Sequence, residues 1–224
     1  MLCRLTRQVR AAPLATTRSF TTKKVFLPIL RKFKQVNSDA VLPPSLFQQK
    51  IILVVNTASK CGLTPQLKSL QELHTRYAAK GLTVLAVPSN DFGAQEVVPE
   101  DDATLEAFYK SEYNVTFPIT TKTKVLGDDA HLFYQAIVEH YTNEVSPAYV
   151  HHHRPHYLSL SSHLNIPRTS RWNFEKFIVD ESGDLRAVFP RNVDPLEPEV
   201  IETIENLLKN LAPPSPPSTT TPTA

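Results

Sequence analysis

Short hydrophobic runs alternate with amphipathic segments through the central part of the chain, and this alternation predicts its secondary structure. Residues 51–55 and 82–87 are apolar and rich in β-branched side chains, as in strands that are buried on both faces of a sheet. Pro88 closes the second run. Residues 174–179 and 185–189 flank a Glu-Ser-Gly-Asp sequence, and this pattern predicts a β-hairpin.

Four further segments carry apolar residues three or four positions apart, the spacing of one helical face. Leu67, Leu70, Leu73 and Tyr77 form such a face in the first of them. The predicted helices span residues 65–79, 103–113, 130–140 and 197–211. Strand, helix and strand, followed by two helices, a hairpin and a last helix, predict an α/β fold, a three-layer sandwich.

The two ends of the chain differ in composition from this domain. Residues 1–24 hold six Arg or Lys, several Ser and Thr and no acidic residue, which is typical of a mitochondrial or plastid transit peptide. The sequence RSFT at residues 18–21 resembles mitochondrial processing sites and favours the mitochondrion, while a disordered basic tail on a cytoplasmic protein stays open. Residues 213–224 are Pro, Ser, Thr and Ala, which predicts a disordered tail. We therefore expect one domain over residues 25–212.

Charge and hydropathy exclude two classes of protein. The 224 residues carry a formal net charge of +2, but residues 25–224 alone carry −4. A nucleic-acid-binding domain is usually basic, so we expect no nucleic-acid partner. We expect no membrane span either, because no apolar run approaches the roughly 18 residues that a span requires.

The chain has two cysteines, and Cys3 lies in the segment that we expect to be removed. Cys61 alone cannot form an internal disulfide, a CxxC pair or a multi-cysteine zinc site. It follows the first predicted strand and precedes the helix that begins near Pro65, where unpaired helix N–H groups favour a thiolate. Gly62 lets the backbone turn there, and Lys60 adds a cation. From these residues alone, an inert buried cysteine stays open as the alternative.

Three blocks of the sequence resemble the glutathione peroxidase family. They are NTASKCGLTPQ at residues 56–66, PSNDFGAQE at residues 88–96 and WNFEKF at residues 172–177. The resemblance extends over about residues 40–210 and is closest to a non-selenium, single-cysteine member of a bacterial-type branch. It implies a thioredoxin-like three-layer α/β/α sandwich with a central mixed sheet. It also implies thiol-dependent reduction of hydrogen peroxide and of organic or lipid hydroperoxides, in the response to oxidative stress.

The same resemblance assigns roles to individual residues. Cys61 matches the peroxidatic residue, and Trp172 and Asn173 match two of its polar partners, whose N–H groups can stabilise a thiolate. Asp91 stands where we expect the family's Gln. An ionised carboxylate cannot donate, so three alternatives stay open. Asp91 is protonated, or it points away from the sulfur and Asn90 or a water takes its place, or the reaction is slower. Without the resemblance, Trp172 is better explained as an anchor of the core.

A single catalytic thiol implies a reaction cycle that is completed from outside. Peroxide oxidises Cys61 to a sulfenic acid, and glutathione or a thioredoxin-type protein then reduces it. We expect no bound cofactor, and the sequence leaves the oligomeric state open. Lys60, Lys68 and Arg171 are the candidate cations for the carboxylates of glutathione, with solvated surface charge as the alternative.

Five histidines between residues 151 and 163 invite a metal site. They lie in residues 141–168, where the resemblance is weakest, and we interpret this segment as an inserted loop with solvated histidines and no metal. Two other functions stay open. One is a peroxide sensor or thiol adaptor that passes oxidation from Cys61 to a partner protein, and the other is a weakly active thioredoxin-fold interaction protein.

Overall fold

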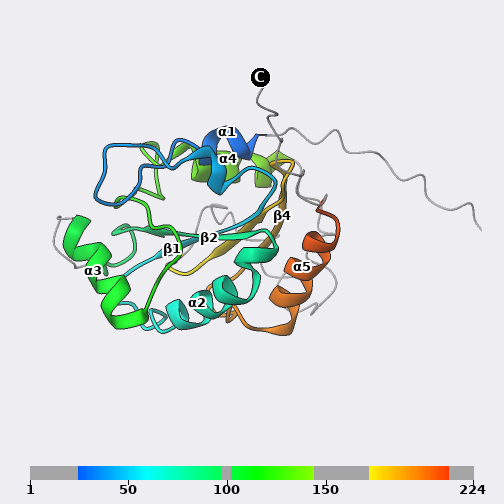
Figure 1. Ribbon diagram of the computed structural model, residues 1–224. Coiled ribbons are helices and arrows are strands. Elements are labelled where there is room, and N and C mark those ends of the chain that lie inside the picture. Colours follow the sequence, from blue (N-terminus) through cyan, green and yellow to red (C-terminus); the bar gives the residue numbers. More distant parts are fainter. Residues whose placement is uncertain (1–24, 97–101, 144–171, 212–224) are drawn as a thin grey trace, which may run out of the picture.

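The computed structural model describes residues 25–96, 102–143 and 172–211 (Figure 1). The expected transit peptide and C-terminal tail lie outside the described residues. So does all but the start of the expected inserted loop. That start is helical, because α4 (Leu132–Asn143) continues to Asn143.

A mixed sheet of four strands forms the centre of the protein, in the order β2-β1-β3-β4. β1 (Ile51–Thr57) pairs in parallel with β2 (Leu82–Pro88), and every residue of both strands is buried. β3 (Lys176–Val179) pairs antiparallel with β1 on its other side and with β4 (Leu185–Phe189). The two apolar runs and the hairpin predicted from the sequence are therefore confirmed.

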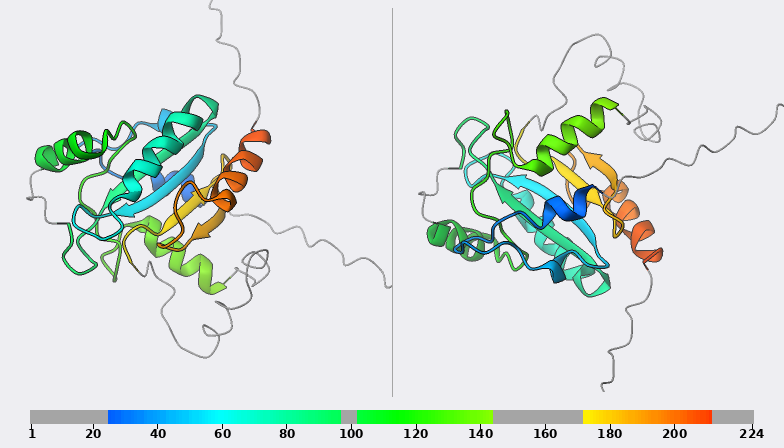
Figure 2. Two further views of the ribbon diagram at one scale, coloured as in Figure 1. Left: turned by 90° about the horizontal axis from the view of Figure 1, so that it is seen from below. Right: turned by 90° about the horizontal axis from the view of Figure 1, so that it is seen from above.

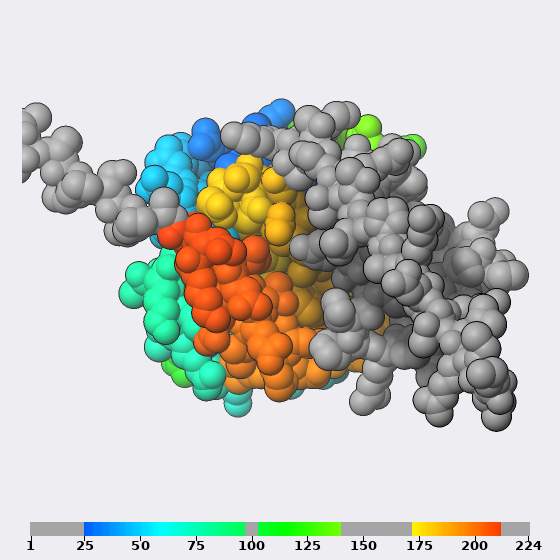
Figure 3. Space-filling view, turned by 90° about the vertical axis from the view of Figure 1, so that its right-hand side faces the viewer, coloured from blue at the N-terminus to red at the C-terminus, as the bar shows by residue number. Residues whose placement is uncertain are grey.

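Helices cover both faces of the sheet and give three layers (Figure 2). One layer contains α2 (Gln66–Tyr77), α3 (Asp102–Tyr113) and α5 (Pro198–Lys209), and the other contains α1 (Phe26–Leu30) and α4. At the surface, α5 lies beside the segment that holds β3 and β4 (Figure 3). This arrangement confirms the predicted α/β/α sandwich. None of the described helices is both long and apolar enough to cross a membrane.

β1 separates two hydrophobic clusters, because successive side chains of a strand point to opposite faces of the sheet. Ile51, Leu53 and Val55 belong to the cluster under α2, α3 and α5. Ile52 and Val54 belong to the cluster under α1 and α4. Each such fully buried aliphatic side chain stabilises the fold by about 1.5–3 kcal/mol, which explains why the strand contains no charged residue.

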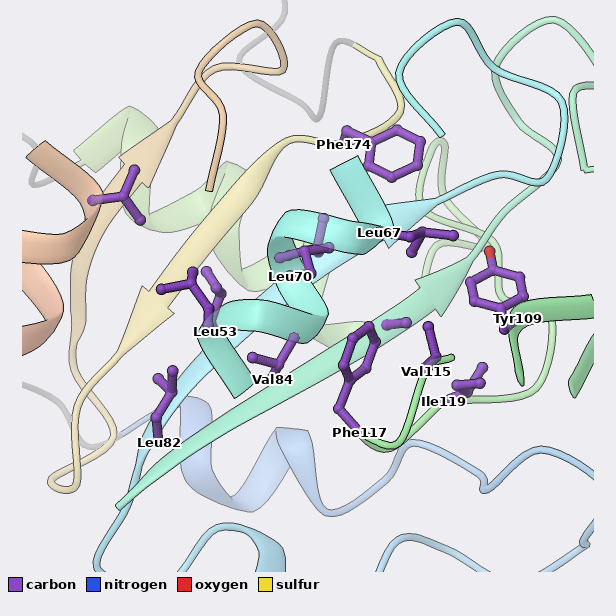
Figure 4. Close-up of a cluster of buried hydrophobic side chains, with 14 of the residues drawn as sticks. Leu53, Leu67, Leu70, Leu82, Val84, Tyr109, Val115, Phe117, Ile119 and Phe174 are labelled. Atoms are coloured by element: carbon purple, nitrogen blue, oxygen red, sulfur yellow. The ribbon is translucent and has the colours of Figure 1, made fainter. Parts of the chain in front are cut away.

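The cluster under α2 extends to the end of α3 (Figure 4). Leu70 of α2 lies near the sheet residues Leu53 and Val84, and Leu67 lies farther along the strands. Tyr109 of α3 closes the cluster near the end of β2. The predicted face of α2, with apolar residues three or four positions apart, is the face that is buried here.

The ends of the predicted elements differ from the structure at a few points. β3 begins at Lys176 rather than at residue 174, because residues 172–174 form a turn in which Phe174 has a φ of +69°. The helix α1 and the short 3-10 helices η1 (Pro44–Leu46) and η2 (Ala78–Lys80) are not predicted from the sequence. Segments of three to five residues are too short to show a hydrophobic period.

Gly183 closes the hairpin turn between β3 and β4. Its φ is +89°, and a Cβ atom there would lie 3.0 Å from Leu27 Cγ and 3.2 Å from Leu27 N. Asp180 Oδ1 completes the turn by accepting the N–H groups of Ser182 (3.0 Å) and Asp184 (2.9 Å).

We expect Gly183→Ala to lower the free energy of unfolding by about 1–2 kcal/mol, because a side chain disfavours the left-handed region and would contact Leu27. Gly62→Ala is the matched control. Gly62 does not have a positive φ, and a Cβ atom there would meet no heavy atom within 4 Å beyond its chain neighbours. Urea unfolding of both variants measures the difference, and equal losses would contradict this account of the turn.

His131 lies at the start of α4 and is packed against Phe33, with the two rings stacked at 3.7 Å between centroids. Its Nδ1 accepts the N–H of Phe133 (3.2 Å). Burial, with a smaller contribution from the charge of Lys32, lowers the pKa of His131 from its ordinary 6.5 to about 4. The folded protein therefore holds this histidine neutral.

Stability should consequently fall as the pH is lowered from 6.5 towards 4, because over this range the unfolded chain binds a proton at His131 and the folded chain does not. His131→Asn keeps an acceptor for Phe133 and removes the titration, so it should reduce this dependence. Urea unfolding of both proteins at pH 7, 5 and 4 measures it. The same slope in both would show that His131 is not the group responsible.

Candidate active site

Cys61 lies in the loop that joins the end of β1 to α2, as predicted, and it is 7% exposed. Thr64 holds this loop closed. Its Oγ1 accepts the N–H of Cys61 (3.0 Å) and lies 2.8 Å from the carbonyl oxygen of Ala58 and 2.7 Å from that of Cys61. The Sγ atom accepts one backbone N–H, that of Leu63, at 3.5 Å.

The N–H group that faces the sulfur is not one of those expected from the sequence. The first N–H groups of α2, at residues 66–68, already donate to carbonyl oxygens three residues earlier. The N–H of Leu63, in the turn before the helix, takes their place. The backbone turns at Gly62, as expected, and it does so without a positive φ.

Residues 90–96 follow β2 and lie against the Cys61 loop. The N–H of Lys60 donates to the carbonyl oxygen of Gln95 (2.9 Å), and the Ser59 hydroxyl lies 3.5 Å from the same oxygen. The Gln95 side chain is half-buried, and its Oε1 accepts Nδ2 of Asn173 (3.0 Å). Asn173 is completely buried. Gln95 therefore links the Cys61 loop to the turn before β3.

Trp172 lies in that turn, half-buried, and contacts both hydrophobic clusters. Its ring centroid is 5.9 Å from that of Phe92, and the guanidinium carbon of Arg191 lies 5.3 Å from the ring centroid. Asn56 Nδ2 donates to the carbonyl oxygen of Trp172 (3.0 Å). The interpretation of Trp172 as a core anchor therefore holds, and its position beside Asn173 leaves it available to the site.

Several known proteins are similar in sequence to this chain. The model of the family described as Glutathione peroxidase matches residues 31–138. Glutathione peroxidase homolog BsaA of Bacillus subtilis is 35% identical over 169 residues, which is 75% of this chain and 91% of that protein. Hydroperoxy fatty acid reductase gpx1 of Synechocystis is 34% identical over 162 residues, which is 72% of this chain and 85% of that protein.

The chain belongs to the glutathione peroxidase family. Family membership makes it an oxidoreductase that reduces peroxide with thiols. Among solved structures, the apo form of Trgpx superposes with a TM-score of 0.55 at 26% identity, covering 83% of this chain and 98% of that one. The thioredoxin-like superfamily protein SPOA0173 gives a TM-score of 0.50 at 18% identity, covering 82% and 98%. The fold of this chain is thioredoxin-like.

Asp91 is directed away from the contact between Gln95 and Asn173. Its Oδ2 accepts the N–H groups of Val125 (2.6 Å) and Leu126 (3.0 Å), in the loop before α4. Of the three alternatives for Asp91, the structure favours the one in which its carboxylate points away from the sulfur, since it binds the backbone of Val125 and Leu126. The amide that meets Asn173 is Gln95, which the sequence pattern did not single out although it lies in the same block.

Glu96 fixes the position of Gln95 from the buried side. The Tyr109 hydroxyl lies 3.3 Å from Glu96 Oε2 and 2.8 Å from Thr57 Oγ1. Burial, followed by the negative charge of Glu96, raises the pKa of Tyr109 well above its ordinary value, so the phenol stays protonated as a donor. The three residues connect the Gln95 segment to α3 and to the end of β1.

The candidate cations are only partly brought to the site. Lys60 and Lys68 are exposed, and Arg171 lies outside the described residues. Arg191, which sequence reasoning missed, is exposed and lies over Trp172, while Gln66 of α2 donates to its carbonyl oxygen (2.8 Å). No motif marks the loop between β4 and α5, so only the fold reveals this cation.

Within the described ranges, no group of three or more His, Cys, Asp or Glu residues is placed to hold a metal ion. The histidines between residues 151 and 163 lie outside those ranges. The structure therefore describes a site made of one thiol, amide groups, an indole and neighbouring cations.

Asp91 and Gln95 should respond differently to substitution. Asp91→Ala leaves two backbone N–H groups without their acceptor, so we expect the free energy of unfolding to fall by about 2 kcal/mol, with peroxide reduction by the folded protein changed less than about threefold. Gln95→Ala removes a donor beside the thiol loop and should slow peroxide reduction about a hundredfold. Urea unfolding and the rate of Cys61 oxidation measure the two effects. The opposite pattern would assign the catalytic role to Asp91.

Proposed function

We propose that this chain reduces hydroperoxides at Cys61 and is returned to its starting state by an external thiol. One observation carries the proposal. Hydrogen bonds from Lys60 and Asn173 to Gln95 join the Cys61 loop, the segment after β2 and the turn before β3 into one site. These are the three segments in which the sequence resembles the family.

In the first step, the Cys61 thiolate attacks one oxygen of the peroxide. An S–O bond forms, the O–O bond breaks, and the departing oxygen takes a proton and leaves as water or an alcohol. The sulfur becomes a sulfenic acid. We assign stabilisation of the developing charge to the N–H donors of Gln95, Trp172 and Asn173, with the Leu63 N–H on the sulfur. In this assignment Gln95 replaces Asp91 as the amide of the site.

In the second step, an external thiol condenses with the sulfenic acid to give a mixed disulfide and water. A second thiol releases Cys61 by exchange and leaves as a disulfide with the first. Cys61 is the one cysteine among the described residues, which supports resolution from outside. Glutathione and a thioredoxin-type protein are the two candidate reductants.

Arg191, Lys60 and Lys68 are the cations that we propose for the carboxylates of an anionic thiol or substrate. The relative in Synechocystis is named a hydroperoxy fatty acid reductase. Together these points support fatty acid hydroperoxides as substrates beside hydrogen peroxide. The basic, Ser- and Thr-rich composition of residues 1–24 supports import into the mitochondrion.

The test is peroxide consumption by the full chain, with glutathione and glutathione reductase in one series and thioredoxin and thioredoxin reductase in the other. We expect turnover with at least one reductant, and we expect Cys61→Ser to abolish it because the nucleophile is lost. Cys3→Ser is the matched control and should leave turnover unchanged. Turnover that survives in Cys61→Ser would refute the proposal. Rapid oxidation of Cys61 without turnover in either series would instead indicate a peroxide sensor or thiol adaptor.

A further inference from the structure

A completely buried lysine lies beside the proposed site and has no part in the proposed reaction. Lys176 is the first residue of β3 and pairs with Val55 of β1 and with Phe189 of β4. Its ammonium group donates to the carbonyl oxygen of Phe174 (2.8 Å). Burying an ammonium group without an ion-pair partner is costly, and no carboxylate of the described residues forms an ion pair with Lys176. Such a group requires an explanation.

The Phe174 carbonyl belongs to a strained turn. Phe174 has a φ of +69°, a region that residues with side chains rarely adopt, so surrounding contacts must hold it there. On one side, the Phe174 N–H donates to the carbonyl oxygen of Asn56 (2.7 Å), and Asn56 Nδ2 donates to that of Trp172. On the other side, the Lys176 ammonium holds the Phe174 carbonyl. The backbone of the turn is thus fixed from β1 and from β3.

We propose that Lys176 is a positioning residue, whose buried ammonium fixes the strained turn that presents Trp172 and Asn173 to Gln95 and the Cys61 loop. A charge-assisted hydrogen bond is shorter and stronger than a neutral one, which suits a group that must hold an unfavourable backbone conformation. This inference rests on Cys61 as the peroxidatic residue. It adds a residue that acts through the turn rather than on the peroxide.

The carboxylates around Lys176 act on it from a distance. Asp194 lies in the loop between β4 and α5, Glu175 precedes Lys176, and Glu197 directly precedes α5. The Asp194 oxygens accept the Ser69 hydroxyl (3.0 Å) and the Leu196 N–H (2.9 Å). Burial lowers the pKa of Lys176 from 10.5 to about 8, and the three carboxylates oppose this shift.

Two consequences of opposite sign follow above pH 8. Between pH 8 and 10.5 the unfolded chain holds more protons at Lys176 than the folded chain, so this residue makes stability rise with pH. Over the same range the ammonium becomes an amine and its hydrogen bond to Phe174 weakens, so peroxide reduction should fall. If Lys176 had a structural role alone, stability would rise with pH but the rate of peroxide reduction would not fall.

The experiment compares Lys176→Met with Lys209→Met in the full chain. Lys209 is an exposed lysine of α5. We expect Lys176→Met to slow the oxidation of Cys61 by hydrogen peroxide about 10- to 100-fold, because a small displacement of catalytic groups costs this much. Lys209→Met should leave the rate unchanged. Trp172 is the single tryptophan of the chain, so its emission reports on the turn directly, and it should shift in Lys176→Met only.

A double substitution separates positioning from a general loss of structure. In an Asn173→Ala background, Lys176→Met should slow the reaction by clearly less than it does alone, because part of its effect is exerted through Asn173. Full additivity of the two losses, or a folded Lys176→Met protein with unchanged rate and emission, would overturn the inference. If Lys176→Met fails to fold, the rate of peroxide reduction by the unmodified protein is measured above pH 8. A rate that does not fall there would contradict the inference. If peroxide reduction does not depend on Cys61, the proposed function is refuted. The emission of Trp172 would then still show whether Lys176 fixes the conformation of the turn.

Discussion

The pairing of β1 with a parallel strand on one side and an antiparallel strand on the other is the constraint on which the site depends. Because β1 and β2 run in parallel and Thr57 lies opposite Pro88, the loops that follow them leave the sheet at the same edge. β3 runs in the opposite direction, so the turn that precedes it begins at that edge as well. Three segments far apart in the sequence are therefore brought together by backbone pairing alone.

Side-chain contacts then refine this arrangement. Asn56, at the end of β1, binds the backbone of the turn on both sides of Asn173, and Glu96 binds Tyr109 of α3 below Gln95. These polar groups are buried, and each one has a hydrogen-bond partner that restricts its orientation. The thiol itself needs little support, since a single backbone N–H faces the sulfur. Most of the buried polar contacts of the site therefore hold the turn with Trp172 and Asn173, and few of them hold the cysteine itself.

The parts of the fold that were predictable are those in which hydrophobic burial follows the sequence closely. β1 and β2 are buried on both faces and so appear as continuous apolar runs, and α2 shows its buried face as a period in the sequence. The strand-to-helix position of Cys61 followed from those two elements. Gln95 was missed because its orientation depends on the left-handed residues Gly93 and Ala94, which redirect the chain after Phe92. A pattern of residue types contains no information on such a change of direction, and the same holds for the turn at Phe174.

The division of the core by β1 has an evolutionary consequence. Residues at odd positions of the strand contact one helical layer and residues at even positions contact the other, so each layer can exchange side chains with compensation inside its own cluster. Substitutions in α4 need no adjustment in α5. This independence ends at Asn56, whose hydrogen bonds with Trp172 and Phe174 are made to backbone atoms that no compensating substitution can alter. The side chains of the two helical layers can therefore change independently in evolution, whereas Asn56 at the end of β1 has to be kept.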